Sequence, residues 1–290
     1  MHAPPFHQGA GPARPQAPWL WLIAGTGEGP RLAEALLQAG WQLRVSVVSA
    51  SAARAYAPHP GLRLAVGPIG SGLREASPLD GVRRELARAR QSHGPFRWVI
   101  DASHPFASQI TAALEQGCEE GGVPLLRLWR PELPGSGVRI LADLPELNGL
   151  ASRGERWLLA IGARRLAEAI HHSAGALHHA RILPRPQALQ QAMAAGLPAE
   201  RVACLQPLPT GSQRPLVEEA LCRRWRIETV LCRRSGGPGE AHWRGLCSDL
   251  GLRLLLLERP AEPGGLLSLP LQSLLERVGT AIETAAETSG

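Results

Sequence analysis

Residues 21–32 constrain the fold most, because an apolar run there stops abruptly at a glycine-rich turn and an amphipathic segment follows. Apolar side chains then recur at helical spacing as far as Leu37, and Gly40 stands where a helix C-cap is expected. Pro30 suits the first turn of a helix, where its missing N–H is not needed. The pattern predicts a strand, a tight turn and a helix whose N-terminal N–H groups favour an anion.

The glycines of this turn match a dinucleotide-binding pattern in part. Gly25 and Gly27 fit the first two glycines of G-x-G-x-x-G, whereas Pro30 stands where the third belongs. The turn is therefore compatible with a nucleotide phosphate site and equally with an ordinary strand-to-helix connection of an α/β protein.

Strand and helix patterns alternate along the whole chain. The first half predicts five strands, near residues 21–24, 43–48, 62–66, 97–100 and 123–128. The second half repeats the series, near residues 157–161, 181–183, 201–205, 227–231 and 252–257, and ends in a helix at about 271–284. This alternation predicts an α/β fold of two doubly wound, Rossmann-like parallel-sheet domains in series, with a cleft between them and ligands at the carboxyl ends of the strands.

A proline- and glycine-rich segment near residues 131–137 separates the two series. We expect a disordered tail over residues 1–18, an NADP-binding domain over 19–131 and a substrate-binding domain over 132–286. Ser77 and Asp80 form a capping-box pattern around Pro78, which predicts a helix start.

The charged residues narrow the kinds of ligand that the chain can be expected to bind. The net charge is +6 and the chain contains no lysine, so all 31 basic residues are arginine, whose planar fork binds carboxylates and phosphates. The arginines are interspersed with acidic residues and no nucleic-acid motif occurs, which favours an acidic small molecule over nucleic acid.

The apolar runs are too short for a membrane span, and five cysteines without C-x-x-C suggest reduced thiols in the cytoplasm. We expect no metal site, and a monomer or weak homo-oligomer.

Three stretches together resemble one family. They are Gly25-Thr26-Gly27-Glu28 with the helix after it, Asp-Ala-Ser-His-Pro-Phe-Ala at residues 101–107 with residues 123–131, and Ser235-Gly236-Gly237 with Glu-Arg-Pro at residues 258–260. The chain resembles the precorrin-6A and cobalt-precorrin-6A reductases of cobalamin biosynthesis. The resemblance implies a two-domain α/β enzyme that uses NADPH to reduce one double bond of a tetrapyrrole, with its site between the domains.

The resemblance implies a cofactor site in the first domain. The predicted NADPH-binding residues are Gly25, Thr26, Gly27, Glu28, Ser49, Ser51, Arg54 and Ser103. The second predicted strand lacks the acidic residue at its end that would hold the ribose 2′-OH of NAD, so Ser49, Ser51 and Arg54 are expected to receive the 2′-phosphate of NADP instead.

Arginines, a histidine and two residues of a glycine-rich loop make up the predicted substrate site, because a precorrin carries acetate and propionate carboxylates. The substrate-binding residues are His104, Arg130, Arg181, Arg185, Arg233, Ser235 and Gly236. His104 is also the candidate proton donor, and a strand order of 3-2-1-4-5 would place its loop beside the Gly25 turn. Cys232-Arg233 stands where the family usually has Thr-Lys, which keeps the charge and changes the donor geometry.

Two other functions stay open from the sequence. A cofactor-free tetrapyrrole synthase of the uroporphyrinogen III synthase type also has two α/β domains, and a non-catalytic NADPH-binding protein would share the first domain. The pairs His171-His172 and His178-His179 are interpreted as a helix end and a polar loop, because no carboxylate or cysteine accompanies them at metal-ligand spacing.

Overall fold

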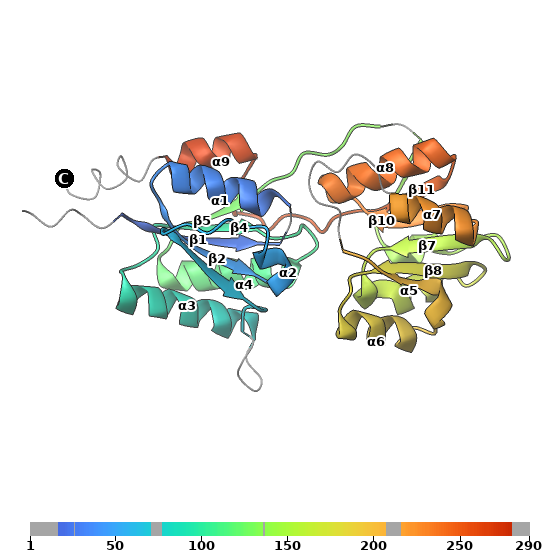
Figure 1. Ribbon diagram of the computed structural model, residues 1–290, viewed down its shortest axis with the longest axis horizontal. Coiled ribbons are helices and arrows are strands. Elements are labelled where there is room, and N and C mark those ends of the chain that lie inside the picture. The colour runs from blue at the N-terminus through green and yellow to red at the C-terminus, as the bar shows by residue number, and fades with distance from the viewer. Residues whose placement is uncertain (1–16, 26, 71–76, 136, 207–215, 280–290) are drawn as a thin grey trace, which may run out of the picture. The chain divides into compact units, whose positions relative to one another are not determined.

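The computed structural model describes residues 17–25, 27–70, 77–135, 137–206 and 216–279 (Figure 1). Two compact units are present. The first contains the described residues up to Ser103, then Gln109–Leu128 and the chain from Gly265. The second contains His104–Ser108 and Trp129–Gly264.

The first unit is built on a parallel sheet of six strands in the order β12-β5-β4-β1-β2-β3. The strands are β1 (Trp19–Ala24), β2 (Gln42–Val47), β3 (Leu62–Val66), β4 (Trp98–Ala102), β5 (Leu125–Leu128) and β12 (Ser268–Leu269). The predicted order 3-2-1-4-5 is thus confirmed for the five longer strands.

Helices cover both faces of this sheet (Figure 1). They are α1 (Glu28–Gln38), α2 (Ala50–Ala53), α3 (Pro78–Ser92), α4 (Ser108–Gly121) and α9 (Leu271–Val278). In β1, Leu20 and Leu22 pack with α1 and α9, whereas Trp21 and Ile23 pack with α3 and α4. Because both faces are buried, β1 is apolar throughout, which explains the continuous run in the sequence.

The second unit has the same design, with a parallel six-stranded sheet in the order β6-β11-β10-β7-β8-β9. Its strands are β6 (Arg139–Leu141), β7 (Arg156–Ala160), β8 (Leu177–Ile182), β9 (Val202–Cys204), β10 (Thr229–Arg233) and β11 (Arg253–Leu257). Helices α5 (Leu166–His172) and α6 (Pro186–Ala194) cover one face, and α7 (Leu216–Trp225) and α8 (Pro238–Leu250) cover the other (Figure 1). Three 3₁₀ turns complete it: η1 (Leu144–Leu147), η2 (Ala163–Arg165) and η3 (Ala199–Arg201).

The predicted fold class is confirmed, but each sheet has six strands and not five. The sixth strands, β6 and β12, are edge strands of three and two residues, too short to show a hydrophobic period.

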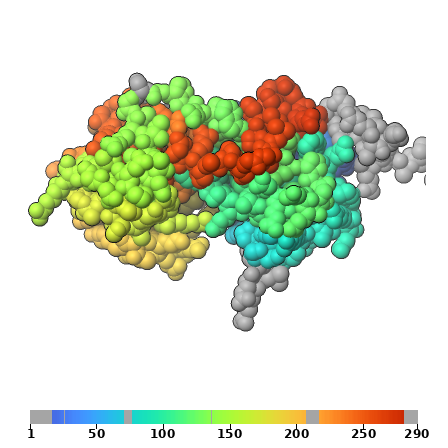
Figure 2. Space-filling view, turned by 180° about the vertical axis from the view of Figure 1, so that it is seen from behind, coloured from blue at the N-terminus to red at the C-terminus, as the bar shows by residue number. Residues whose placement is uncertain are grey.

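The C-terminal segment was predicted in the second domain, and the structure places it in the first unit. β12 pairs with β5, and Leu274 and Val278 of α9 enter the core beside α1. The indole N–H of Trp41 donates a hydrogen bond to the carbonyl of Gly279 at 3.0 Å. The red C-terminal helix lies directly on the surface of the first unit in Figure 2. The range 132–286 is therefore corrected to end at Gly264, and His104–Ser108 joins the second unit.

The predicted polar loop at His178-His179 is also wrong. Both histidines lie inside β8 and are buried, and the strand begins four residues earlier than the predicted 181. Nε2 of His178 lies 2.8 Å from Oγ of Ser173, and burial lowers the pKa of His178 to about 4. A buried imidazole with one hydroxyl partner fits a strand interior, although its residue type suggested a loop.

Helix ends follow the sequence signals closely. The capping box of Ser77 and Asp80 is present with both hydrogen bonds, and Pro78 opens α3. Pro30 lies in the first turn of α1, and Gly40 follows its C-cap with a φ of 87°. Over the described ranges, no helix has the length and apolar character needed to cross a membrane.

Candidate functional site

The end of β1 and the start of α1 carry the two glycines of the predicted phosphate-binding turn. The N–H of Gly25 donates to the carbonyl of Ala102 on β4 at 3.3 Å, and Gly27 is the N-cap of α1. Gly27, as the N-cap, has no side chain to offer to the first N–H groups of the helix, and the positive end of a helix favours an anion. Glu28 lies half-buried in the first turn, and Thr26 lies outside the described residues.

Gly29 explains why the helix can start so close to the strand. A Cβ at this position would meet Oη of Tyr56 and lie 2.8 Å from Cβ of Ala24, both inside van der Waals contact. The glycine therefore lets α1 pack against β1 and Tyr56, as the third glycine of a dinucleotide-binding turn does, one position earlier in the sequence.

The end of β2 carries the next group of predicted residues. Ser49 is the N-cap of α2, and its Oγ accepts the N–H of Ala52 at 3.3 Å. Ser51 is half-buried in α2, and Arg54 is exposed at its C-cap. Acidic residues are absent from position 48 to position 54, so the exposed surface here carries hydroxyls and one guanidinium.

Asp101 is the centre of a buried ionic network in the first unit. Its carboxylate accepts the N–H of Ser103 at 2.9 Å and the hydroxyl of Thr111 at 2.7 Å, and forms an ion pair with Arg127. Asp101 and Arg127 are 0% and 3% exposed. The network fixes the chain at Ser103, which is buried, directly after β4. Asp101 therefore orients the loop.

His104 follows at once, in a segment that belongs to the second unit. Its Nδ1 accepts the backbone N–H of Phe106 at 3.2 Å, and its carbonyl accepts the N–H of Ala107 at 2.7 Å. A ring nitrogen that accepts a hydrogen bond carries no proton, so the neutral ring holds its proton on Nε2. The loop therefore fixes the tautomer of His104 and leaves Nε2 as the donor.

Gly236 and Ser235 lie after β10, at the start of α8. Gly236 has a φ of 69°, and a Cβ there would collide with the carbonyl of Pro131. Its N–H donates to the buried carboxylate of Glu240 at 2.8 Å, and Ser235 is buried beside it. Gly236 thus has a packing role that its sequence motif did not reveal.

The four predicted arginines of the second unit lie on different elements. Arg130 is 5% exposed, and its carbonyl accepts a hydrogen bond from Arg259 at 2.8 Å, close to Gly236. Arg181 on β8 donates to the carbonyl of Gln206 at 2.9 Å and lies 3.5 Å from the carboxylate of Glu218. Arg185 is exposed at the N-cap of α6. Arg233, the last residue of β10, lies with its guanidinium over the ring of Phe106 at 5.1 Å.

The structure therefore brings some of the predicted residues together. Gly25 and Ser103 follow the adjacent strands β1 and β4, and Ser49 follows β2 on the other side of β1. Arg130 and Gly236 are also neighbours, whereas Arg181 and Arg185 lie at β8, two strands away from β10. Sequence reasoning missed Arg127, although it lies directly opposite Asp101 in the register of two parallel strands, where a counter-ion could have been sought.

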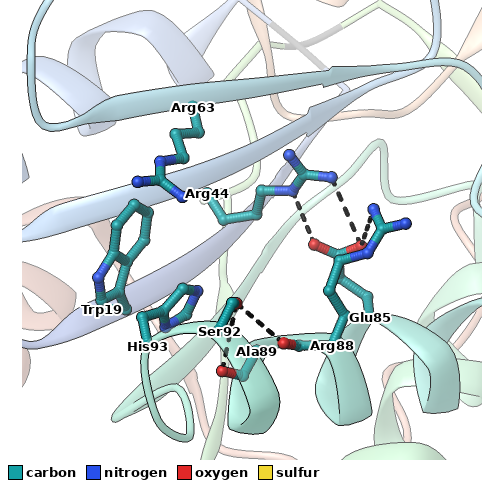
Figure 3. Close-up of a pocket in the computed structure, with 8 residues that line it drawn as sticks. All are labelled: Trp19, Arg44, Arg63, Glu85, Arg88, Ala89, Ser92 and His93. Carbon is teal, nitrogen blue, oxygen red and sulfur yellow. Dashed lines mark hydrogen bonds and ion pairs between the residues drawn. The ribbon is translucent and has the colours of Figure 1, made fainter.

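A small cavity in the first unit lies away from these residues (Figure 3). It has a volume of about 50 Å³ and is lined by Trp19, Arg44, Arg63, Glu85, Arg88, Ala89, Ser92 and His93. Arg63 stacks on the indole of Trp19, and Arg44 binds Glu85 at 2.7 Å. These side chains bind one another at the amino-terminal half of the sheet, opposite the end where parallel sheets bind ligands.

The fold defines a class of protein with two parallel α/β units, the first of which has a glycine at the end of β1 and a glycine N-cap at the start of α1. In the part of the chain that the structure describes, no group of three or more His, Cys, Asp or Glu side chains could hold a metal ion. The family described as "Precorrin-6x reductase CbiJ/CobK" matches residues 19–284. The chain belongs to this family.

Individual proteins similar to this chain carry the same reductase names as the family. The chain is 34% identical over 249 residues to the cobalt-precorrin-6A reductase of Synechocystis sp., covering 83% of this chain and 88% of the relative. It is 30% identical to the precorrin-6A reductase of Mycobacterium tuberculosis over 246 residues, covering 84% and 90%. The solved structure "CobK precorrin-6A reductase" aligns with a TM-score of 0.68 at 24% identity, covering 90% of this chain and 96% of that one, which shows the shared fold.

Proposed function

We propose that the chain is a reductase of cobalamin biosynthesis that uses NADPH to reduce one ring double bond of precorrin-6A or of its cobalt form. Membership of the reductase family supports the reaction class. The observation that carries the choice of cofactor is the first unit's glycine pair, where Gly25 follows β1 and Gly27 is the N-cap of α1.

The residues present fit a dinucleotide phosphate. The N–H groups at the start of α1 would hold the pyrophosphate, and Gly29 allows the close packing that such a turn needs. Arg54 and the hydroxyls of Ser49 and Ser51 would hold the 2′-phosphate, because no carboxylate stands after β2 to repel it.

Reduction of the double bond adds a hydride to one carbon and a proton to the other. NADPH, when bound, supplies the hydride. His104 is the proposed proton donor through Nε2: the proton would leave an imidazolium, and the neutral ring that remains would accept the Phe106 N–H at Nδ1. Substrate carboxylates would be bound in the second unit by predicted residues that include Arg130, Arg185 and Arg233.

Nucleotide titration of matched variants tests the cofactor assignment. NADPH is expected to bind the wild-type chain in the micromolar range and more tightly than NADH. Gly25→Val is expected to abolish binding of both nucleotides, because its side chain blocks the approach to the backbone. Arg54→Ala is expected to weaken NADPH about tenfold or more and to leave NADH unchanged, because one charge-assisted contact to the 2′-phosphate is lost.

Arg88→Ala is the matched control, because this arginine on α3 is 73% exposed and lies away from the turn. It is expected to change neither affinity. Equal affinity of the wild-type chain for NADPH and NADH, with Arg54→Ala affecting both alike, would refute the assignment of the 2′-phosphate. Absence of any nucleotide binding would refute the proposed cofactor.

A further inference from the structure

A second cavity lies in the second unit, beside the C-terminal half of α8. Its volume is about 400 Å³, which is in the range of pockets that hold small organic molecules. Residues of α8 form one wall, and residues 134, 135, 137 and 138 form another; Figure 1 shows this part of the chain, in green, passing alongside α8. The lining includes none of the predicted cofactor or substrate residues, so the proposed function leaves this cavity unexplained.

The wall formed by α8 is a single stripe of side chains. Positions i, i+3, i+4 and i+7 share one face of a helix, and the lining residues with this spacing are Arg244, Cys247, Ser248 and the C-cap Gly251. Cys247 is buried in the core on this side of the sheet, together with Leu254 of β11, which also lines the cavity. The cavity therefore combines an apolar floor with two polar side chains, as small-molecule sites commonly do.

The guanidinium of Arg244 is fixed through one nitrogen and leaves the others available. Its Nε donates to Oε1 of Glu240 at 2.7 Å, and Oε2 of Glu240 accepts the N–H of Gly236 at 2.8 Å. The side chains of Arg244 and Glu240 are 14% and 0% exposed, so burial holds this pair in place. The two Nη groups of Arg244 form no hydrogen bond with any residue that the structure describes. This end of a guanidinium has parallel N–H groups, which match the two oxygens of a carboxylate.

Glycines keep the space beside this guanidinium open. Gly135 has a φ of 148°, and a Cβ there would lie 2.9 Å from Nη1 of Arg244. A Cβ at Gly137 or at Gly251 would meet nothing within 4 Å. The three glycines therefore present bare backbone to the cavity, which suits a flat apolar group.

The cavity lies at the amino end of the second sheet. Leu252 and Leu254 stand at the start of β11, and Val138 directly precedes β6. Parallel sheets bind cofactor and substrate at the opposite, carboxyl end. A ligand in this cavity would therefore be a molecule distinct from both.

We propose that this cavity binds a small aromatic carboxylate, with its carboxylate on the Nη groups of Arg244 and its ring on Leu252 and Leu254. Arg244 is the charged residue among those that line the cavity, which favours an anion, and the apolar lining favours a ligand that is otherwise uncharged. The hydroxyl of Ser248 forms no hydrogen bond with a described residue and is placed on the same stripe to donate to a carboxylate oxygen.

Calorimetric titration with 2-naphthoate tests the site, with 2-naphthamide as a neutral ligand of the same shape. One molecule of 2-naphthoate is expected to bind each wild-type chain, and the amide is expected to bind about tenfold more weakly or less, because it carries no charge for Arg244. Arg244→Gln is expected to raise the dissociation constant of 2-naphthoate about tenfold and to leave that of the amide unchanged.

A second variant tests the cavity without removing the ion pair of Arg244 with Glu240. The ring of Ser248→Phe is expected to fill the cavity and to abolish binding of both ligands, and this variant decides the matter if Arg244→Gln does not fold. Gly245→Phe is the matched control, because Gly245 is exposed on the same helix, does not line the cavity, and would place a Cβ in open space. It is expected to bind 2-naphthoate like the wild-type chain.

Saturating NADPH or uroporphyrin I, a tetrapyrrole with acetate and propionate groups, is expected to leave the affinity for 2-naphthoate unchanged. Displacement by either would overturn the site, because 2-naphthoate would then occupy the predicted cofactor or substrate site. Two further results would also overturn it: no binding of 2-naphthoate to the wild-type chain, and equal affinity of Ser248→Phe and the wild-type chain. Failure of the proposed function is separate, because it appears as loss of NADPH binding and leaves the effects of Arg244→Gln and Ser248→Phe intact.

Discussion

Asp101→Asn is expected to destabilise the first unit strongly, because the substitution removes a buried negative charge with which Arg127 forms an ion pair. The two side chains are 0% and 3% exposed, so water cannot replace the carboxylate. Thr111 still offers its hydroxyl oxygen to Arg127 at 2.7 Å, but a neutral acceptor does not compensate the buried charge. Breaking one partner of a buried pair costs about 3–5 kcal/mol of unfolding free energy.

Urea unfolding followed by tryptophan fluorescence measures the effect. The two units are fitted as separate transitions, and only that of the first unit is expected to shift, with an unchanged m-value. Glu120→Gln is the control, because it breaks an arginine–carboxylate pair with Arg83 whose side chains are 47% and 41% exposed, and it is expected to cost about 0–1 kcal/mol. The double variant Asp101→Leu/Arg127→Met is expected to recover most of the loss, because it removes both charges. A cost for Asp101→Asn no larger than that of Glu120→Gln would refute the reasoning.

Two further predictions concern the second unit, and a third concerns the cysteines of both units. Gly236→Ala is expected to lower the unfolding free energy by more than about 2 kcal/mol, because Gly236 has a φ of 69° and an added Cβ would collide with the carbonyl of Pro131. Gly239→Ala is the control in the same urea titration. A Cβ at Gly239 in α8 meets open space, so this variant is expected to be neutral or slightly stabilising. Burial lowers the pKa of His178 to about 4, so between pH 6.5 and 4 the imidazole is protonated in the unfolded chain and not in the folded one. The unfolding free energy is therefore expected to fall as the pH drops from about 6.5 to 4. A His178→Gln variant whose unfolding free energy falls as steeply over this range would contradict the account. Cys204 is exposed and is expected to react quickly with a thiol reagent in the native protein. The other four cysteines are buried and are expected to react only after unfolding. Fast labelling of more than one thiol would count against the structure.

Most of the fold could be predicted from the sequence, because long buried strands and capped helices leave local signals. The continuous apolar run of β1, the capping box at Ser77 and the glycine turns each depend on neighbouring residues only. The strand order of the first sheet followed from the general topology of doubly wound folds. These elements are therefore where sequence and structure agree.

The parts that failed depend on partners far away in the chain. β12 has two residues, and α9 shows an apolar face without indicating which sheet it covers, so its return to α1 could not be read from residues 265–279. His178 and His179 are polar residue types whose burial in β8 depends on Ser173 and on the ring of Trp225.

The same reason limited the candidate site. Asp101 could be recognised as the start of a distinctive run at the end of a predicted strand, but its partner Arg127 lies on the adjacent strand and became evident only from the register. Arg233 could be named as a cation near a glycine-rich loop. That it forms no ion pair with a described residue and that it contacts Phe106 are tertiary facts, and they separate it from the paired Arg234.

The most direct test of the central claim is a turnover measurement with purified chain, NADPH and precorrin-6A, run in parallel with cobalt-precorrin-6A. We expect NADPH to be oxidised in proportion to the product, and the product mass to increase by two hydrogens with one of the substrates. Deuterium carried on the nicotinamide is expected to appear in the product. Oxidation of NADPH without a change in the mass of either tetrapyrrole, or no oxidation although both ligands bind, would contradict the account.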